Sequence, residues 1–272
     1  MQWYPFPRPG IRRALLVVLA VLMAPGAIAE ADLTASWDAG YVGLPASLTG
    51  QAPVLGNWRG ETVQRALDRL DETTRVPAVI YLHGCTGFGG EGNAYRHFLL
   101  LQGFAFFAPD SLAQPGRTRN CDPQSRQTGL RGNAGMQRRA ELHFALDRIA
   151  ALPWIDQDRL YLIGFSEGAA AAAGYDGNRF AGVVLTAWHC HGPLGNRGLA
   201  APLHVPVLAI VSSQDPWYPG LKDRTCATFT DKRPASRAIL LSEPTHALLT
   251  SNDSEAARRS RQAILAFLTG KS

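Results

Sequence analysis

The feature that most constrains the fold is the pentapeptide Gly-Phe-Ser-Glu-Gly at residues 164–168, together with its flanks. An apolar stretch at residues 159–163 predicts a buried strand before it, and the alanine-rich residues 169–173 predict a helix after it. A G-x-S-x-G sequence in this context is typical of a nucleophile elbow, a sharp turn that presents a serine hydroxyl at the end of a sheet. Glycines are needed there because side chains would clash with the crossing backbone. Ser166 is therefore the candidate nucleophile, and an ordinary tight turn is the alternative.

The first 29 residues have the pattern of an export signal. Arg8, Arg12 and Arg13 precede an apolar run at residues 14–24 that is short for a bilayer span, and Ala-Ile-Ala at residues 27–29 fits a cleavage site. We expect a signal peptide at residues 1–29 and a periplasmic or extracellular mature protein. An uncleaved membrane anchor is the alternative.

The remaining residues, 30–272, have the size of a single domain. The signal carries three of the 27 basic residues and no acidic residue, so the formal net charge of +5 largely disappears with it. Without a basic stripe we expect no nucleic-acid partner. No later apolar run is long enough to cross a membrane. The sequence does not indicate an oligomeric state.

Apolar runs alternate with helical patterns along most of this domain. This alternation predicts an α/β fold with a mostly parallel, doubly wound sheet and helices on both faces. Residues 31–57 predict only extended segments. The expected strands are residues 78–82, 104–108, 160–163, 182–186, 205–211 and 238–241, and the expected helices are residues 61–70, 94–102, 133–152, 167–174 and 254–269.

Sites in such sheets form at the carboxyl ends of the strands, which limits the possible partners of Ser166. A serine nucleophile needs a base, and the base needs an orienting carboxylate. His246, between the last strand and the last helix, is the candidate base, and Asp215, after the preceding strand, is the candidate acid. Glu243 is the rival acid, although it lies close to His246 in sequence. Asp215 could instead be a turn aspartate before Pro216.

Acyl transfer also needs backbone N–H donors for the developing oxyanion. The strand at residues 78–82 ends in His-Gly-Cys-Thr-Gly, a turn that can supply one donor, and the residue after the nucleophile can supply the other. We assign these donors to Cys85 and Glu167. His83 is interpreted as a structural histidine under the turn. Glu167 also places a carboxylate beside the elbow, which we expect to disfavour anionic acyl groups.

The four cysteines are Cys85, Cys121, Cys190 and Cys226. An even number in an exported protein indicates two disulfides with three possible connectivities, and buried free thiols are the alternative. The sequence His-Cys-His around Cys190 could suggest zinc, but adjacent residues rarely point at one ion, so no metal site is expected.

Other side chains after strand ends are candidates for the substrate pocket. Trp188 and Trp217 could line it, with aromatic packing under loops as the alternative. The long loop after Pro109 carries arginines that could meet an anionic substrate, although a solvated loop is the favoured interpretation. These arginines are Arg117, Arg119, Arg126 and Arg131.

The His-Gly-Cys turn, the Pro-Asp pair at residues 109–110, the elbow and the segments of Asp215 and His246 together resemble the α/β-hydrolase fold over residues 76–269. Within this fold they are most similar to the dienelactone hydrolase-like group. Members of the group proper use a cysteine in the elbow and lack a leader, whereas this chain has Ser166 and an export signal.

The resemblance also bears on the cysteines, because exported relatives carry a cysteine in the His-Gly-Cys turn. It implies the pairs Cys85–Cys121 and Cys190–Cys226, which would link loops at one rim of the sheet.

We therefore expect an exported serine hydrolase that cleaves small-molecule carboxylic esters or lactones through an acyl-enzyme, without a cofactor. A peptidase or a polyester or carbohydrate esterase would use the same residues, because function lies in the site and not in the fold. A non-catalytic exported binding protein of the same fold is the alternative of another class.

Overall fold

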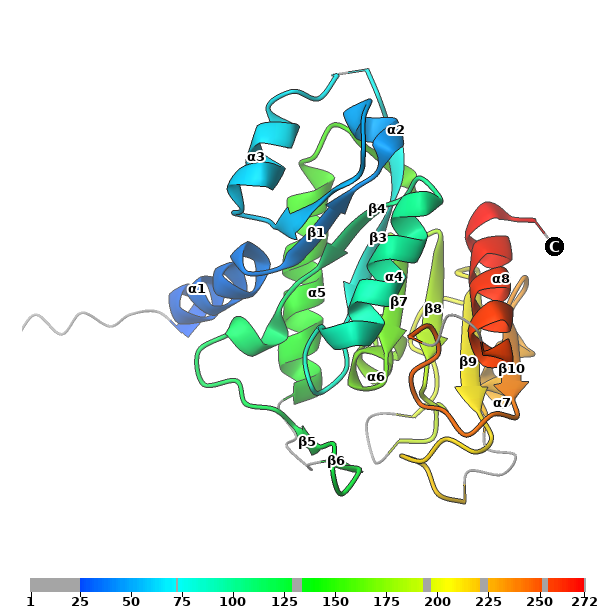
Figure 1. Cartoon of the computed structure of the whole chain (residues 1–272). Coiled ribbons are helices and arrows are strands. Elements are labelled where there is room, and N and C mark those ends of the chain that lie inside the picture. Colours follow the sequence, from blue (N-terminus) through cyan, green and yellow to red (C-terminus); the bar gives the residue numbers. More distant parts are fainter. Residues whose placement is uncertain are drawn as a thin grey trace, which may run out of the picture.

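The computed structural model describes residues 25–71, 73–128, 134–192, 197–220, 225–250 and 254–271. The strands of its main sheet are β1 (Tyr41–Leu44), β2 (Val54–Asn57), β3 (Val76–Leu82), β4 (Ala105–Ala108), β7 (Ile155–Phe165), β8 (Gly182–Thr186), β9 (Val207–Ser212) and β10 (Arg237–Leu241). They form an eight-stranded sheet in the order β2-β1-β4-β3-β7-β8-β9-β10 (Figure 1). All neighbours from β4 to β10 pair in parallel, whereas β1 is antiparallel to both β4 and β2. The predicted mostly parallel sheet is therefore confirmed.

Helices cover both faces of the sheet, as predicted. They are α1 (Pro25–Asp38), α2 (Ala46–Thr49), α3 (Glu61–Leu67), α4 (Gly89–Leu101), α5 (Ala134–Ala150), α6 (Glu167–Ala173), α7 (Ala227–Thr230) and α8 (Glu255–Thr269), with a 3-10 turn, η1 (Ser111–Ala113). A small separate hairpin pairs β5 (Cys121–Asp122) with β6 (Gln127–Thr128). In the described part of the chain, no helix has the length and apolarity needed to span a bilayer.

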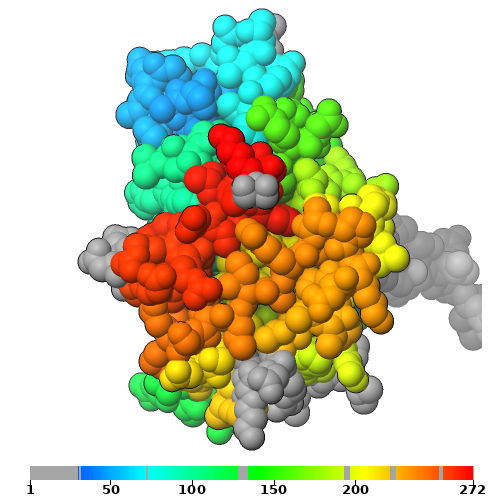
Figure 2. Space-filling view, turned by 90° about the vertical axis from the view of Figure 1, so that its right-hand side faces the viewer, coloured from blue at the N-terminus to red at the C-terminus, as the bar shows by residue number. Residues whose placement is uncertain are grey.

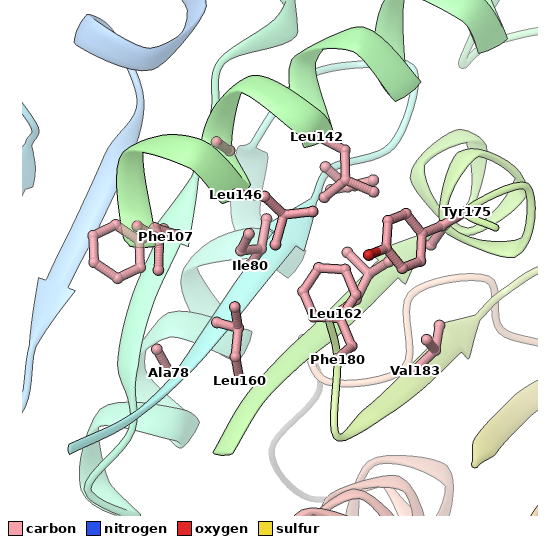
Figure 3. Close-up of a cluster of buried hydrophobic side chains, with 14 of the residues drawn as sticks. Ala78, Ile80, Phe107, Leu142, Leu146, Leu160, Leu162, Tyr175, Phe180 and Val183 are labelled. Atoms are coloured by element: carbon pink, nitrogen blue, oxygen red, sulfur yellow. The ribbon is translucent and has the colours of Figure 1, made fainter. Parts of the chain in front are cut away.

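Two apolar clusters hold the layers together. Successive side chains of a strand point to opposite faces, so Ile80 packs with the α5 and α6 side and Tyr81 packs with the α4 and α8 side. Figure 3 shows the first cluster, in which Leu142 and Leu146 of α5 meet Ile80 and the neighbouring strand. The carboxyl ends of the parallel strands are thereby fixed relative to one another.

The start of the domain differs from the expectation. Residues 31–57, predicted as extended segments only, contain most of α1 and all of β1, α2 and β2. Trp37 is buried and its ring centroid lies 5.8 Å from that of Phe107 and 5.1 Å from that of Trp58. These partners come from other segments, so local composition does not reveal them. Most of the predicted signal peptide, residues 1–24, lies outside the described residues.

A buried polar network joins α1 and α5 near the end of β3. Arg138 and Glu141 of α5 are buried, with charged atoms 3.5 Å apart. Glu141 also accepts hydrogen bonds from Ser36 of α1 and from Gln114, the latter at 3.1 Å. Buried charges are stable only when they are paired and hydrogen-bonded, so this network fixes α5 under the region where β3 ends.

The last part of the chain covers the β10 side of the molecule. Figure 2 shows the segments after residue 225, coloured orange to red, spread across this face. They include the loop between β10 and α8, which carries His246.

Candidate active site

The turn that carries Ser166 joins β7 to α6 and has the sharp geometry predicted for it. Ser166 has φ 54° and ψ −116°, a conformation that non-glycine residues rarely adopt. A Cβ atom added to Gly168 would lie 2.0 Å from the carbonyl oxygen of Leu82, and one added to Gly164 would lie 2.5 Å from that of Gly168. Only glycine fits at these two positions, and α6 can therefore pack backbone to backbone against the end of β3.

Three side chains from separate loops meet at this end of the sheet. Nε2 of His246 lies 2.9 Å from Oγ of Ser166, and Nδ1 of His246 lies 2.7 Å from Oδ2 of Asp215. An ionised carboxylate can only accept, so Nδ1 carries the proton and Nε2 is left to accept from the serine hydroxyl. The arrangement can activate the hydroxyl by removing its proton.

The two candidate acids have different surroundings. Asp215 is buried, and its Oδ1 accepts the N–H of Trp217 at 2.9 Å, so it forms the aspartate turn that was the alternative and contacts His246 as well. Glu243 instead accepts the N–H of Ala256, at the start of α8, at 2.5 Å. Glu243 therefore anchors the following helix, and Asp215 is the partner of the imidazole.

Aromatic rings surround His246, whose side chain is only 12% exposed. The ring centroids of Phe165 and Trp217 lie 5.2 Å from that of His246, and that of Tyr218 lies 5.9 Å away. The hydroxyl of Tyr218 donates to the carbonyl oxygen of Ala187 at 3.3 Å. Burial raises the pKa of Tyr218, so this hydroxyl stays a donor. Tyr218 was not singled out from the sequence; its only signal is its place beside Trp217.

The two tryptophans considered for the pocket lie in different places. Trp217 packs against the ring of His246, as described above. Trp188 is buried in the cluster on the α5 and α6 side and lines a hollow of about 160 Å³ together with Arg139 and Gly174. Trp188 is thus packed in this cluster and also borders the hollow.

A buried carboxylate on α4 holds the loop that carries His246. Glu91 accepts the backbone N–H groups of Leu248 at 2.7 Å, Leu249 at 2.9 Å and Thr250 at 3.0 Å, and also the Thr250 hydroxyl. No local sequence pattern marks Glu91, because its partners lie far along the chain. Its role in placing the loop is visible only in the folded structure.

The turn after β3 fixes the peptide between Gly84 and Cys85. The N–H of Ser111 donates to Nε2 of the buried His83 at 3.1 Å, which leaves the proton on Nδ1 to bond the carbonyl oxygen of Gly84 at 2.7 Å. The C=O and N–H of a trans peptide point in opposite directions, so the N–H of Cys85 is turned away from His83. Within the described residues, neither this N–H nor that of Glu167 donates to another group.

The cysteines are paired as the resemblance implied. Disulfides join Cys85 to Cys121 and Cys190 to Cys226, with Cα atoms 5.8 Å and 5.0 Å apart. Because Cys190 is in a disulfide, it has no thiolate to offer a metal ion. Among the described residues, no group of three His, Cys, Asp or Glu side chains is arranged to hold one.

The loop after η1 contributes an arginine to the site. Arg117 pairs with the carboxylate of Glu167, whereas Arg119 and Arg126 are exposed and Arg131 lies outside the described residues. The pairing removes the basis for expecting Glu167 to repel anionic acyl groups by its charge.

Comparisons with known proteins agree with this architecture. A model of the dienelactone hydrolase family matches residues 65–271. The fold is similar to that of a dienelactone hydrolase-like promiscuous phosphotriesterase from metagenomic libraries, with a TM-score of 0.55 and 19% identity over 73% of this chain and 87% of that chain. It is also similar to Est1E from Butyrivibrio proteoclasticus, with a TM-score of 0.53 and 13% identity over 85% of this chain and 93% of that chain. No curated protein sequence matches. The predicted α/β-hydrolase fold is confirmed.

The buried His83 predicts a pH dependence of stability. Burial, and then the charge of Arg138, lower the pKa of His83 well below its ordinary value of 6.5. Below that pH the unfolded chain binds a proton that the folded protein does not. The free energy of unfolding should therefore fall as the pH drops from about 6.5 toward the lowered pKa, by at most about 1.4 kcal/mol per pH unit.

Urea unfolding between about pH 7.5 and 5.5 measures this slope. His83→Gln should remove the contribution of His83 to this slope, whereas His97→Gln, on the exposed side of α4, should leave the slope unchanged. Equal slopes in the wild type and His83→Gln would contradict the assignment.

Glu91→Gln should loosen the His246 loop. An amide is a weaker acceptor than a carboxylate and brings an NH₂ group toward three N–H donors, so the free energy of unfolding should fall by about 2–3 kcal/mol. Hydrogen exchange should accelerate at Leu248, Leu249 and Thr250. Glu255→Gln, which is exposed on α8, is the matched control. Unchanged exchange at these three amides would show that Glu91 does not hold the loop.

Proposed function

Because the chain belongs to the dienelactone hydrolase family, we propose that it is a serine hydrolase that cleaves carboxylic esters or lactones of small molecules. The family supports ester hydrolysis as the reaction class. The hydrogen-bonded series Asp215, His246 and Ser166 is the observation that supports a serine mechanism.

In the proposed reaction, Ser166 attacks the acyl carbon of the substrate. His246 takes the hydroxyl proton at Nε2 and then gives it to the departing alkoxide. Asp215 keeps the ring in the required tautomer and stabilises the imidazolium. Water then repeats the sequence on the acyl-enzyme, which releases the acid and restores the serine. Neither half-reaction uses a cofactor.

The backbone N–H groups of Cys85 and Glu167 are the proposed donors to the oxyanion. The hydrogen bond between His83 and the carbonyl of Gly84 sets the direction of the Cys85 N–H before substrate binds. Donors that are oriented in advance need no reorganisation during the reaction, and one such donor lowers the barrier by about 3–4 kcal/mol.

The surroundings of His246 suggest the kind of substrate. The rings of Phe165, Trp217 and Tyr218 offer apolar walls, which suit an acyl or alcohol group with apolar surface. One solved structure of Est1E contains ferulic acid. We therefore propose aromatic esters as the first compounds to compare with alkyl esters of rising chain length.

Export is part of the proposal. The two disulfides fit an oxidising compartment, and the pattern of residues 1–29 supports a signal peptide. We propose that residues 30–272 act as a single domain in the periplasm or outside the cell.

Ser166→Ala tests the nucleophile. Covalent labelling by a fluorophosphonate should disappear, and hydrolysis of p-nitrophenyl acetate should fall by roughly 10⁶-fold or to background. Ser47→Ala, in the exposed turn of α2, should be labelled like the wild type. A folded wild type that is not labelled would favour a binding protein of the same fold.

Asp215→Asn tests whether Asp215 or Glu243 is the carboxylate that orients His246. The amide favours the wrong tautomer of His246, so kcat should fall by about 10⁴-fold. Glu243→Gln makes the same chemical change at the anchor of α8 and should keep kcat within about tenfold, because Glu243 does not contact the imidazole. A larger loss in Glu243→Gln than in Asp215→Asn would reverse the assignment. Parallel assays on esters and peptide amides would separate an esterase from a peptidase.

A further inference from the structure

A short segment of the loop after η1, from Arg117 to Cys121, contacts both residues that carry the proposed oxyanion donors. Arg117 donates to Oε1 of Glu167 at 2.5 Å, and Asn120 donates to Oε2 of the same carboxylate at 3.1 Å. The next residue, Cys121, is bonded to Cys85. This segment therefore links the turn after β3 to the elbow by one covalent bond and two hydrogen bonds.

The contact between Arg117 and Glu167 is not a surface ion pair. The side chain of Arg117 is 4% exposed and that of Glu167 is 15% exposed, so solvent and salt screen the pair little. Nε of Arg117 also donates to Oγ of Ser111 at 3.3 Å, and the N–H of Ser111 donates to His83. The guanidinium group thus contacts the elbow and also the residues that support the turn.

An unpaired carboxylate at this position would oppose the reaction. Glu167 carries a proposed oxyanion donor on its own backbone, so its side-chain charge lies near the place where a second negative charge develops. Like charges repel strongly where water is excluded. The repulsion would be larger in the transition state than with the bound ester, whose carbonyl oxygen is neutral, and it would therefore slow the chemical step.

We propose that Arg117 is a positioning residue for the reaction. It neutralises Glu167. Together with Asn120 and the disulfide of Cys121, it fixes the backbone N–H groups of Cys85 and Glu167 relative to each other. The inference rests on the proposed function, because the donors matter only if the protein is a serine hydrolase. It gives Arg117 a different role from binding an anionic substrate, since Glu167 already occupies its guanidinium group.

Steady-state hydrolysis of p-nitrophenyl acetate by the full chain tests this role through charge removal and rescue. Arg117→Met leaves the buried carboxylate of Glu167 without a counter-charge, so kcat should fall about 30-fold or more while KM changes less than about threefold. Glu167→Gln removes the charge and keeps an acceptor oxygen and the backbone N–H, so its kcat should fall less than that of Arg117→Met. The double variant should regain at least about tenfold of the kcat lost in Arg117→Met, because no charge then needs neutralising.

Arg119→Met, an exposed arginine of the same loop, is the matched control and should keep the wild-type kcat. Arg117→Gln is made in parallel and should show the same loss and rescue, so that a folded variant is measured even if Arg117→Met fails to fold. Thermal unfolding identifies the folded variants.

A wild-type kcat in folded Arg117→Met or Arg117→Gln would overturn the inference. So would a double variant that is no faster than the single arginine variant, because the loss would then not come from the charge of Glu167. Failure of the proposed function gives a different result, since the wild type itself would neither hydrolyse the ester nor react with a fluorophosphonate.

Discussion

The close approach of α6 to the end of β3 is the constraint on which the rest of the site depends. At Gly168 the two backbones are so close that no side chain can stand between them. This contact forces Ser166 into its positive φ and places it beside the turn after β3, where a Cβ atom on Gly84 would lie 3.4 Å from that of Ser166. The nucleophile and the turn that bears a proposed oxyanion donor are neighbours for this reason.

Buried charged and polar groups with specific hydrogen-bond partners hold the loops around this contact. Glu91 accepts hydrogen bonds from three backbone N–H groups of the His246 loop. Arg138 donates to the carbonyl oxygen of His83 at 2.5 Å beneath the turn after β3. Arg117 and Glu167 hold the elbow. A buried charge is costly unless its partners are in place, so these groups favour one arrangement of the loops over alternatives. Such fixed loops are what a preorganised site requires.

Much of the framework could be predicted because its signals are local. Apolar runs and helical patterns marked most of the strands and helices from residue 61 onward, although β7 begins at Ile155, earlier than predicted, and neither α7 nor the hairpin of β5 and β6 was expected. The places of Ser166, Asp215 and His246 followed from strand ends and chain order. The contacts of Glu91 and the pairing of Arg117 with Glu167 join segments far apart in sequence, and neither has a periodic pattern. β1 likewise lacks a local signal, because this four-residue strand is defined by its pairing with β4 and β2.

The two edges of the sheet affect how the protein behaves when concentrated. Exposed strand edges invite pairing with other chains. Here one edge is β2, only four residues long and packed by α3, since a Cβ atom on Gly56 would lie 2.9 Å from Val63. The other edge, β10, has five residues and begins with the charged Arg237. Both edges are short, which limits their use as templates for sheet-mediated aggregation.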